Sequence, residues 1–341
     1  MMLSVLIIGC GNIAGGFDNA SEPGSLARTH AGAYAAHGQF LVHTCIDPDE
    51  HRRAAFMERW NIPVGYASIE QLVARNAMAS HSPPFDIVSI CSPTSCHHRD
   101  VQQALHLSPK LIFCEKPVTG NLQQSQHVAQ SCSDQGVLLA VNHNRRWDPK
   151  VTRLRDQLNA GDWGAIRSVT GQYNKGILNN GSHMLDLLHD LFGPVTLIYC
   201  GAPCFDYWES DPSVPVILVS ADGVPITLTC GDASDYSLFE LQVVTQRGVI
   251  AMEDGGLGWR TRLSAPSLHF AGYRALEAGQ TNEGGYMQTM TNAVANIYRA
   301  VTSGEALAST GASALSAQHI CQQILARSSQ ASPTTDTSGT A

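Results

Sequence analysis

The chain has 341 residues, enough for two domains that each bury a full hydrophobic core. Its 43% hydrophobic and 15% charged residues are typical of a compact soluble protein and exclude disorder for most of the sequence. A net charge of −8, with four lysines and no basic run, argues against nucleic acid or an anionic membrane surface as a partner.

The cysteines and the first residues indicate a soluble cytoplasmic protein. Ten cysteines are scattered through the sequence, and no pair has the C-x-x-C spacing of a metal or redox site. Reduced thiols in the cytoplasm are the natural interpretation, and we assign no metal site. The opening MMLSVLIIGCGN has no basic residue before its apolar run, which is far too short to span a bilayer, so we interpret it as a first strand.

The first half of the chain alternates short apolar runs with helix-like stretches, among them 68–78 and 98–107. The apolar runs lack polar alternation, so we expect both faces of each strand to be buried. This pattern predicts a doubly wound α/β domain at residues 1–144, in which helices cover a parallel sheet. The predicted strands are 3–9, 40–47, 85–92, 110–117 and 137–144.

A glycine motif follows the first strand directly. Gly9, Gly11 and Ala14 form G-x-G-x-x-A around Asn12 and Ile13, at a position where a dinucleotide pyrophosphate meets a helix N-terminus. Gly9 permits a tight turn, and Gly11 lets the phosphates approach the backbone. Because an ordinary strand-to-helix turn also favours glycine, the motif indicates a cofactor site only together with other features.

The second strand ends in Asp47, whose carboxylate can accept hydrogen bonds from the ribose of NAD and would repel the 2′-phosphate of NADP. The alternative is an aspartate that caps a turn. Asp47 lies 33 residues after Ala14 instead of about 20, and the excess matches a polar insertion at 17–29, predicted as a loop that breaks the first helix. NAD is the expected cofactor, and the nearby Arg52 and Arg53 leave NADP as the less favoured one.

Lys116 stands between an apolar strand and Pro117, so its backbone is held extended. Ligands of open α/β sheets bind at the carboxyl ends of strands, and there the ammonium group of Lys116 can be aimed at a site for proton transfer. The alternative is a surface lysine that follows a strand.

After about residue 145 the pattern changes to short strands joined by tight turns, including Asp222–Gly223. It predicts an α+β domain at 145–327 with a largely antiparallel sheet, followed by a disordered tail at 328–341. Helices at about 150–159, 183–192 and 284–303 are expected to cover one face of this sheet. The predicted strands are 194–202, 215–221, 225–231, 238–245 and 248–254.

The helix at 183–192 is apolar except for His183, Asp186 and Asp190. Their spacing places all three on one helical face. Because buried imidazole and carboxylate groups are costly without hydrogen bonds, this stripe is either a satisfied structural contact or a substrate site.

Together these motifs resemble the Gfo/Idh/MocA family of NAD(P)-dependent oxidoreductases, whose members act mostly on sugars and cyclitols. The resemblance implies a Rossmann fold for the N-terminal domain and covers about residues 3–193, and ALASTGASALSAQHICQQILARS resembles the usual C-terminal helix of the family. The matching features are GCGNIA, Asp47, CSPTSCHH for T-P-x-x-x-H, CEKPV for E-K-P, NRRW for R-[RK]-aromatic, and GSHMLDLLHDLFG for G-x-H-x-x-D.

The resemblance implies roles for individual residues. Lys116 would be the catalytic lysine, often followed in the family by a cis proline, here Pro117. His183 would handle the proton of the reacting hydroxyl or carbonyl, while Asp186 would bind substrate or orient His183. Arg146 would lie near the substrate pocket. The residues expected to line the nicotinamide side are Ser92, Pro93, His97 and Glu115.

One position departs from the family pattern. Many polyol-oxidising members carry an aspartate four residues before the histidine, where this chain has Asn179, which cannot serve as a base. This leaves Lys116 with His183 for proton transfer, with Lys175 or the 17–29 loop as further parts of the substrate pocket.

The sequence thus predicts hydride transfer between nicotinamide and a carbinol carbon of a sugar, sugar derivative or cyclitol. The alternatives are an NAD-dependent glycosidase of the same fold and a catalytically silent, dinucleotide-sensing regulatory protein. A homodimer or homotetramer is expected, because an open sheet in the second domain would leave an apolar face in need of cover and family members commonly pair through it.

Overall fold

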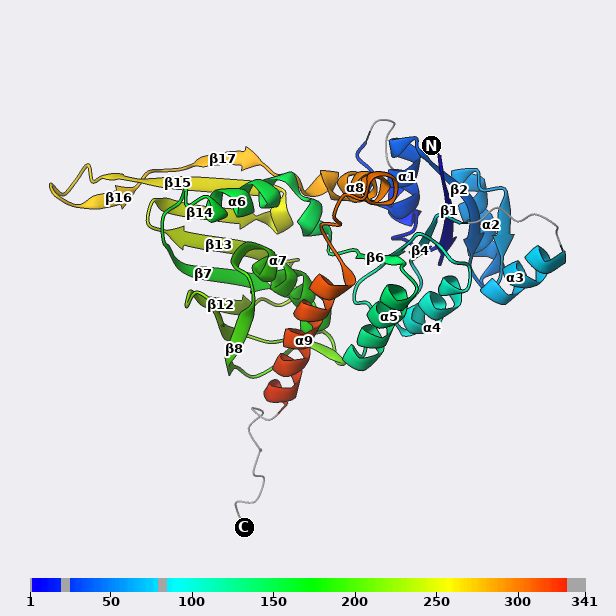
Figure 1. The fold of residues 1–341 in the computed structure, drawn as a ribbon. Coiled ribbons are helices and arrows are strands. Elements are labelled where there is room, and N and C mark those ends of the chain that lie inside the picture. Colours follow the sequence, from blue (N-terminus) through cyan, green and yellow to red (C-terminus); the bar gives the residue numbers. More distant parts are fainter. Residues whose placement is uncertain (1, 20–24, 79–84, 330–341) are drawn as a thin grey trace, which may run out of the picture. The chain divides into compact units, whose positions relative to one another are not determined.

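The computed structural model of the protein describes residues 2–19, 25–78 and 85–329 (Figure 1). The chain forms two compact units, of which the first contains Met1–Thr152 and Gly285–Leu315. The second unit contains Arg153–Gly284 and Ser316–Ala341. A segment from the C-terminal part of the chain therefore returns to the first unit, whereas the sequence suggested one division near residue 145.

The first unit is built on a six-stranded parallel sheet in the order β3-β2-β1-β4-β5-β6. Every residue of β4 and β5 is buried, in agreement with their unbroken apolar runs. The order reverses between β1 and β4, the kind of switch point at which such sheets bind ligands. The five predicted strands are confirmed, and β3 is an additional short one. The strands are β1 (Leu3–Ile8), β2 (Phe40–Ile46), β3 (Val64–Tyr66), β4 (Ile87–Ile90), β5 (Leu111–Cys114) and β6 (Leu138–Val141).

Helices connect these strands, and the predicted helices at 68–78 and 98–107 are confirmed as α3 and α4. The side chains of Thr29, Asp49 and Asn121 accept backbone N–H groups and begin α1, α2 and α5. The helices are α1 (His30–His37), α2 (Glu50–Trp60), α3 (Ile69–Met78), α4 (Thr94–Leu105), α5 (Leu122–Asp134) and the 3₁₀ turn η2 (Asn144–Trp147).

The segment behind the glycine motif corrects one expectation, because a regular helix does not follow it within residues 10–19. A turn and the 3₁₀ helix η1 (Gly16–Asp18) take its place, and α1 begins at residue 30. The carboxylate of Asp18 accepts hydrogen bonds from the backbone N–H groups of Arg28 (3.1 Å) and Thr29 (3.0 Å), which closes the loop predicted at 17–29. Residues 20–24 of that loop lie outside the described residues.

Helix α8 (Thr289–Ser303) also differs from the expectation that it would cover the second domain's sheet. Its apolar side chains Met290, Val294 and Ile297 are buried in one cluster with Tyr34 of α1. The apolar face of α8 is therefore buried within the first unit, which explains why residues 285–315 belong there.

The second unit contains a nine-stranded sheet in the order β16-β15-β14-β13-β7-β12-β11-β8, with β17 paired to β15. The five predicted strands are confirmed, but the sheet is mixed, because β12 runs parallel to β7. The strands are β7 (Ile166–Tyr173), β8 (Val195–Cys200), β11 (Val216–Ser220), β12 (Pro225–Cys230), β13 (Phe239–Thr245), β14 (Gly248–Glu253), β15 (Gly258–Pro266), β16 (Arg274–Leu276) and β17 (Gln280–Glu283), beside a hairpin of β9 (Cys204–Trp208) and β10 (Asp211–Ser213).

Helices α6 (Pro149–Asn159) and α7 (Ser182–Phe192) lie on one face of this sheet, as predicted (Figure 1). A Cβ on Gly171 of β7 would lie 3.2 Å from Sδ of Met184, so α7 packs closely on the sheet. From Ser316 onward, helix α9 (Gly311–Ser328) belongs to the second unit, where Arg327 donates a hydrogen bond to the carbonyl oxygen of Leu197. Helix α9 includes Ser328, the first residue of the predicted tail, and residues 330–341 of that tail lie outside the described residues.

Two further observations complete the fold. Each of the ten cysteines is a free thiol. Within residues 2–19, 25–78 and 85–329, no helix combines the length and apolar character that crossing a membrane requires.

Candidate active site

The glycine motif forms a tight turn that leaves open space in front of Gly11. Gly9 has a φ of +89°, and a Cβ there would lie 2.6 Å from the backbone of Cys91, so this turn excludes any side chain. A Cβ on Gly11 would meet nothing within 4 Å. The backbone of Gly11 therefore faces open space at the end of β1, and the two glycines serve different purposes.

Asp47 is buried beside this turn. Its Oδ2 accepts a hydrogen bond of 2.9 Å from the backbone N–H of Cys10, and its Oδ1 accepts one from Asp49. The Nη1 atom of Arg52 lies 3.4 Å from both oxygens. Asp47 is thus the turn-capping residue of the alternative interpretation, and it lies at the carboxyl end of β2.

A cavity of about 320 Å³ adjoins this turn, and its volume suits part of a dinucleotide. It brings the backbone of the glycine motif together with cationic and aromatic side chains of α2. The residues on its walls include Gly11, Asn12, Arg52, Phe56, Arg59 and Trp60.

Lys116 follows β5 and is half-buried, with a cis peptide bond to Pro117. The imidazole of His97 joins this turn to the loop after β4, because its two nitrogens lie 3.0 Å from the carbonyl oxygen of Pro117 and 2.8 Å from that of Ser92. The Ser92 hydroxyl donates to Asp100 at 2.6 Å. The side chains of Ser92 and His97 therefore hold the scaffold behind Lys116, and Pro93 begins α4 as its N-cap residue.

Glu115 points into a buried hydrogen-bond network. Its Oε1 lies 2.9 Å from Nε2 of His30 and accepts a hydrogen bond of 2.6 Å from Nδ2 of Asn142. Burial raises the pKa of Glu115, but the hydrogen bond and charge of His30, the Asn142 amide and the charge of Lys116 together lower it below its ordinary value. Glu115 is therefore an ionised group held between α1 and β6.

His143, which the sequence did not single out, is uncharged at neutral pH. Burial and then the positive charges of Lys116 and Arg146 lower the pKa of its imidazole to about 3. Arg146 is half-buried, and its Nη1 lies 3.5 Å from the carbonyl oxygen of Ala308.

In the second unit, the segment before α7 forms a π-helix, η3 (Gly176–Gly181). Asp211 of β10 holds its start: one carboxylate oxygen accepts from Leu178 N–H at 2.8 Å and the other from Asn179 N–H at 3.0 Å. A Cβ on Gly176 would lie 2.2 Å from this carboxylate, so glycine is required there. Lys175 begins the segment with a φ of +62°, and its Nζ lies 5.5 Å from the centre of the Tyr207 ring.

Helix α7 carries the polar stripe that the sequence predicted. Asp186 is 1% exposed and His183 is half-buried. Asp190 forms an ion pair with Arg155 of α6 at 3.1 Å. This pair agrees with the alternative in which the residue makes a satisfied structural contact. The predicted residues thus gather in two groups, one at the strand ends of the first unit and one on η3 and α7 of the second.

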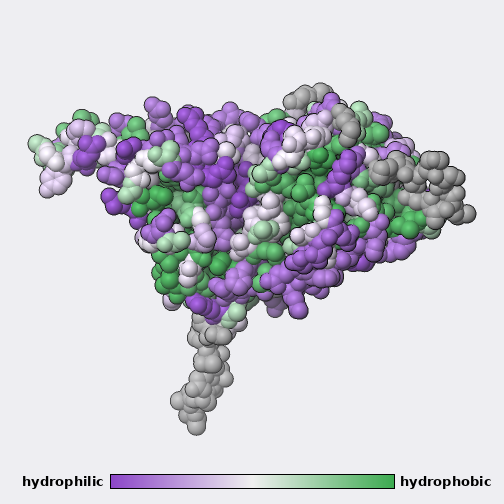
Figure 2. All heavy atoms as spheres, in the orientation of Figure 1, coloured by the Kyte–Doolittle hydropathy of each residue, from purple (hydrophilic) through white to green (hydrophobic). Residues whose placement is uncertain are grey.

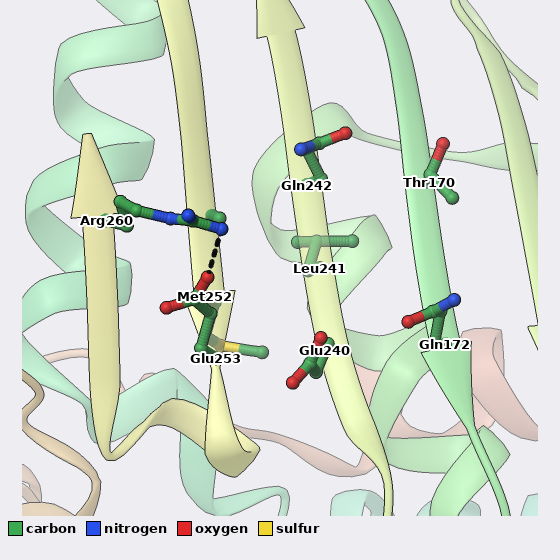
Figure 3. A pocket seen from close by; sticks show the side chains of 9 residues that line it. Thr170, Gln172, Glu240, Leu241, Gln242, Met252, Glu253 and Arg260 are labelled. Atoms are coloured by element: carbon green, nitrogen blue, oxygen red, sulfur yellow. Dashed lines mark ion pairs between the residues drawn. The ribbon is translucent and has the colours of Figure 1, made fainter. Parts of the chain in front are cut away.

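A hollow of about 170 Å³ on the sheet of the second unit contains none of the predicted site residues. Figure 3 shows polar side chains of β7 and β13 beside an ion pair between Arg260 and Glu253, whose atoms lie 2.6 Å apart. Here the sheet is polar, which corrects the expectation of an apolar face. The polar residues are Thr170, Gln172, Glu240, Gln242, Glu253 and Arg260.

Hydrophobic side chains reach the surface instead in the region of β8, as Figure 2 shows. Ile198 and Tyr199 are 57% and 59% exposed there, and Ile217 of the neighbouring strand β11 is 42% exposed. Tyr199 and Ile217 are direct cross-strand partners, so these residues form a small contiguous apolar patch.

Comparison with known proteins shows which families and relatives this sequence resembles. Residues 3–143 match the oxidoreductase family with an NAD-binding Rossmann fold. Inositol 2-dehydrogenase of Rhizobium meliloti is 28% identical over 190 residues, which are 50% of this chain and 57% of that protein. D-apiose dehydrogenase of Paraburkholderia graminis is 26% identical over 231 residues, which are 62% of this chain and 59% of that protein.

The fold of the whole chain also has a counterpart among solved structures. The crystal structure of an oxidoreductase from Agrobacterium radiobacter, in complex with NAD+, L-tartaric acid and magnesium, has a TM-score of 0.76 at 15% identity and covers 96% of this chain and 97% of that one. The sequence matches, by contrast, span 57% and 59% of the two curated relatives named above. Over residues 3–143, the chain matches the Gfo/Idh/MocA family of oxidoreductases, whose model describes an NAD-binding Rossmann fold.

Proposed function

We propose that the protein is an NAD-dependent dehydrogenase that transfers hydride between nicotinamide and a carbinol carbon of a sugar, sugar derivative or cyclitol. One observation carries this proposal: Gly9, Gly11 and Asp47 stand together at the ends of β1 and β2, with open space before Gly11. The relatives named for inositol and D-apiose support the substrate class.

Bound nicotinamide supplies the carbon that takes up or returns the hydride. We assign the proton of the reacting hydroxyl to Lys116 and His183. Lys116 suits this role because the His97 bridge holds its turn and because a neutral His143 adds no positive charge beside it. Arg146, Lys175, Asn179 and Asp186 are assigned to substrate binding.

NAD is the proposed cofactor and NADP the less favoured one. The Asp47 carboxylate at the end of β2 can accept ribose hydroxyls and repels a 2′-phosphate. Arg52 is drawn toward Asp47 and Asp49, and Nη1 of Arg53 bonds the carbonyl oxygen of Asp47 at 2.6 Å. The guanidinium groups of Arg52 and Arg53 are therefore both already bound to protein oxygen atoms beside the glycine motif.

The deciding experiment is a titration with NADH and NADPH, followed by nicotinamide fluorescence and then repeated with sugars and inositols. Tighter binding of NADH, with an absorbance change at the nicotinamide band on adding one polyol, is expected. Sugar release without net NADH formation would instead indicate a glycosidase, and cofactor binding without turnover would indicate a sensor. Absence of binding by either cofactor overturns the proposal.

We also propose a cytoplasmic homodimer or homotetramer. The apolar patch of Ile198, Tyr199 and Ile217 is the surface that favours self-association. Sedimentation analysis tests this proposal, and replacement of Ile198 by Asp is expected to shift the assembly toward the monomer.

A further inference from the structure

Two histidines of the first unit lie in contact at its surface and have no part in the proposed hydride transfer. His98 lies on α4, directly after the His97 that supports the Lys116 turn, and His127 lies on α5. The two helices lie side by side (Figure 1). Nε2 of His98 is 3.0 Å from Nδ1 of His127, and the ring centres are 5.3 Å apart.

The next turn of both helices shows why the two imidazoles lie opposite each other. There, Nε2 of Gln102 donates a hydrogen bond of 3.1 Å to the hydroxyl of Ser131. Gln102 follows His98 by four residues, and Ser131 follows His127 by four, so the two helices run parallel and one turn of each faces one turn of the other. The contact between α4 and α5 therefore has a fixed register.

The contact between the rings requires an unprotonated nitrogen. A hydrogen bond between two imidazoles needs an N–H on one ring and a lone pair on the other. An imidazole nitrogen with its lone pair is also the commonest protein ligand of metal ions. His127 is exposed and His98 is half-buried, so an ion from solvent reaches both nitrogens once the shared proton has moved to the other nitrogen of its ring.

The spacing of the two nitrogens suits a single bound ion. Metal–imidazole bonds are about 2.0–2.1 Å long, so two such ligands at a right angle hold their nitrogens about 2.8–3.0 Å apart, and at a tetrahedral angle about 3.3–3.4 Å apart. The observed 3.0 Å matches the right angle. Right-angled nitrogen ligands are typical of Ni²⁺ and Cu²⁺, whereas Mg²⁺ and Ca²⁺ prefer oxygen ligands.

Solvent supplies the remaining ligand positions. In the part of the chain that the structure describes, no group of three or more histidine, cysteine, aspartate or glutamate side chains could hold a metal ion. An ion at this pair therefore has two protein ligands and exchanges freely with solvent. The adjacent cation Arg99 forms an ion pair with Asp100 at 2.8 Å, which offsets its charge beside the pair.

From this geometry we propose that His98 and His127 form an exchangeable two-histidine site for a late first-row divalent transition-metal ion such as Ni²⁺. The bound ion links α4 to α5. Both helices adjoin the turn that carries Lys116, because His97 of α4 contacts the carbonyl oxygen of Pro117 and α5 begins at residue 122. The site lies on the surface of the first unit and does not depend on the proposed function.

The test is a calorimetric titration of the full chain with NiCl₂ near neutral pH, in a buffer that does not bind the ion. Every protein carries Cys204→Ser, because this exposed thiol could itself bind Ni²⁺. We expect the parent protein to bind one ion that excess Mg²⁺ does not displace. His98→Gln and His127→Asn are each expected to weaken binding at least about tenfold, because one of two ligands is lost.

These replacements distinguish metal binding from packing. Gln places an amide where Nε2 of His98 lies, and Asn places one where Nδ1 of His127 lies, so each keeps a hydrogen-bonding group but is a poorer ligand for Ni²⁺. The ion-free variants are expected to melt at the parent temperature, and Ni²⁺ is expected to stabilise the parent more than either variant. His106→Gln is the matched control, because His106 is exposed at the end of the same helix and outside the pair.

Each outcome decides the proposal. Equal Ni²⁺ affinity in the parent and both variants would place the ion elsewhere, and weakening in one variant alone would reduce the site to a single histidine; both results overturn the pair. Failure of the parent to bind Ni²⁺, or an equal loss in His106→Gln, also overturns it. Where one variant does not fold, the other gives the decision, because each removes one ligand.

Discussion

Nε2 of His30 lies 2.9 Å from Oε1 of Glu115, although the two residues are 85 positions apart and the imidazole is fully buried. The same oxygen accepts the amide of Asn142, so one carboxylate joins α1, β5 and β6. Because Lys116 follows Glu115 directly, this junction also fixes the backbone from which the proposed catalytic lysine projects.

Replacement of Glu115 by Ala is expected to lower the free energy of unfolding by roughly 2–4 kcal/mol, because two buried donors lose their acceptor. Glu115→Gln keeps an amide oxygen in reach of both donors and is expected to cost less. Urea unfolding at pH 7 measures both values. Equal stability of the two variants would contradict a hydrogen-bonding role for this oxygen.

The difference in unfolding free energy between wild type and Glu115→Gln is expected to change with pH in one direction. The pKa of Glu115 is lowered below its ordinary value of 4.5, so its stabilising contribution is fully present above that value and is lost as the pH falls through the folded-state pKa. The gap in unfolding free energy between wild type and Glu115→Gln is therefore expected to be constant near neutrality and to narrow below pH 4.5. Urea titrations from acid to neutral pH follow it.

Gly9→Ala and Gly11→Ala are expected to affect the stability of the protein differently. Gly9→Ala forces a Cβ to 2.6 Å from the backbone of Cys91 at a positive φ, so we expect a loss of stability of at least about 1–3 kcal/mol. Gly11→Ala meets no atom within 4 Å, so it is expected to keep wild-type thermal stability.

A measurement of cofactor binding then distinguishes Gly11 from a glycine in an ordinary loop. A methyl group at Gly11 lies where phosphates would approach the backbone, so NADH affinity is expected to fall at least about tenfold, equivalent to 1.4 kcal/mol. Fluorescence titration measures this loss. Gly120→Ala, also with open space around its Cβ but outside the motif, is the control, and an equal effect there would refute the assignment.

How far the sequence predicts the fold depends on where each signal is encoded. Strands such as β4 and β5 are buried on both faces, so their local sequence is sufficient to identify them. The position of α8 depends on its packing against Tyr34 of α1, more than 250 positions away in the sequence. The parallel pairing of β12 with β7 likewise depends on contacts between segments that are separated in the sequence. The periodicity of apolar residues within one segment does not identify such distant partners.

The same reasoning applies to the site. Gly9, Gly11 and Asp47 were predictable because strand ends and turn chemistry are local. The hydrogen bond from Asn142 to Glu115 joins residues 27 positions apart, so no local pattern predicts it. Asp211, which holds η3, carries no sequence signal beyond an ordinary strand aspartate.

Lys116→Ala is expected to lower kcat by roughly 10²- to 10⁴-fold, the usual contribution of a general acid or base. NADH affinity should stay near that of wild type, because the His97 bridge to the turn uses the carbonyl oxygen of Pro117 and no atom of the lysine side chain. Lys110→Ala is the control, because the ammonium group of Lys110 pairs with Asp86 at 2.8 Å and its side chain is 51% exposed. Undiminished turnover in Lys116→Ala would remove this lysine from the mechanism.

Asp211 and Asp206 offer a matched pair for testing the support of η3. Each oxygen of Asp211 accepts a separate N–H, so Asp211→Asn must turn an NH₂ group toward a donor and is expected to cost about 1–3 kcal/mol of unfolding free energy. Asp206 uses one oxygen, for the N–H of Lys175, and Asp206→Asn can keep that bond. Urea unfolding is expected to show a loss in the first variant alone, with faster amide hydrogen exchange at 178 and 179. Equal losses in both would mean that charge, and not the paired acceptors, holds the start of this π-helix.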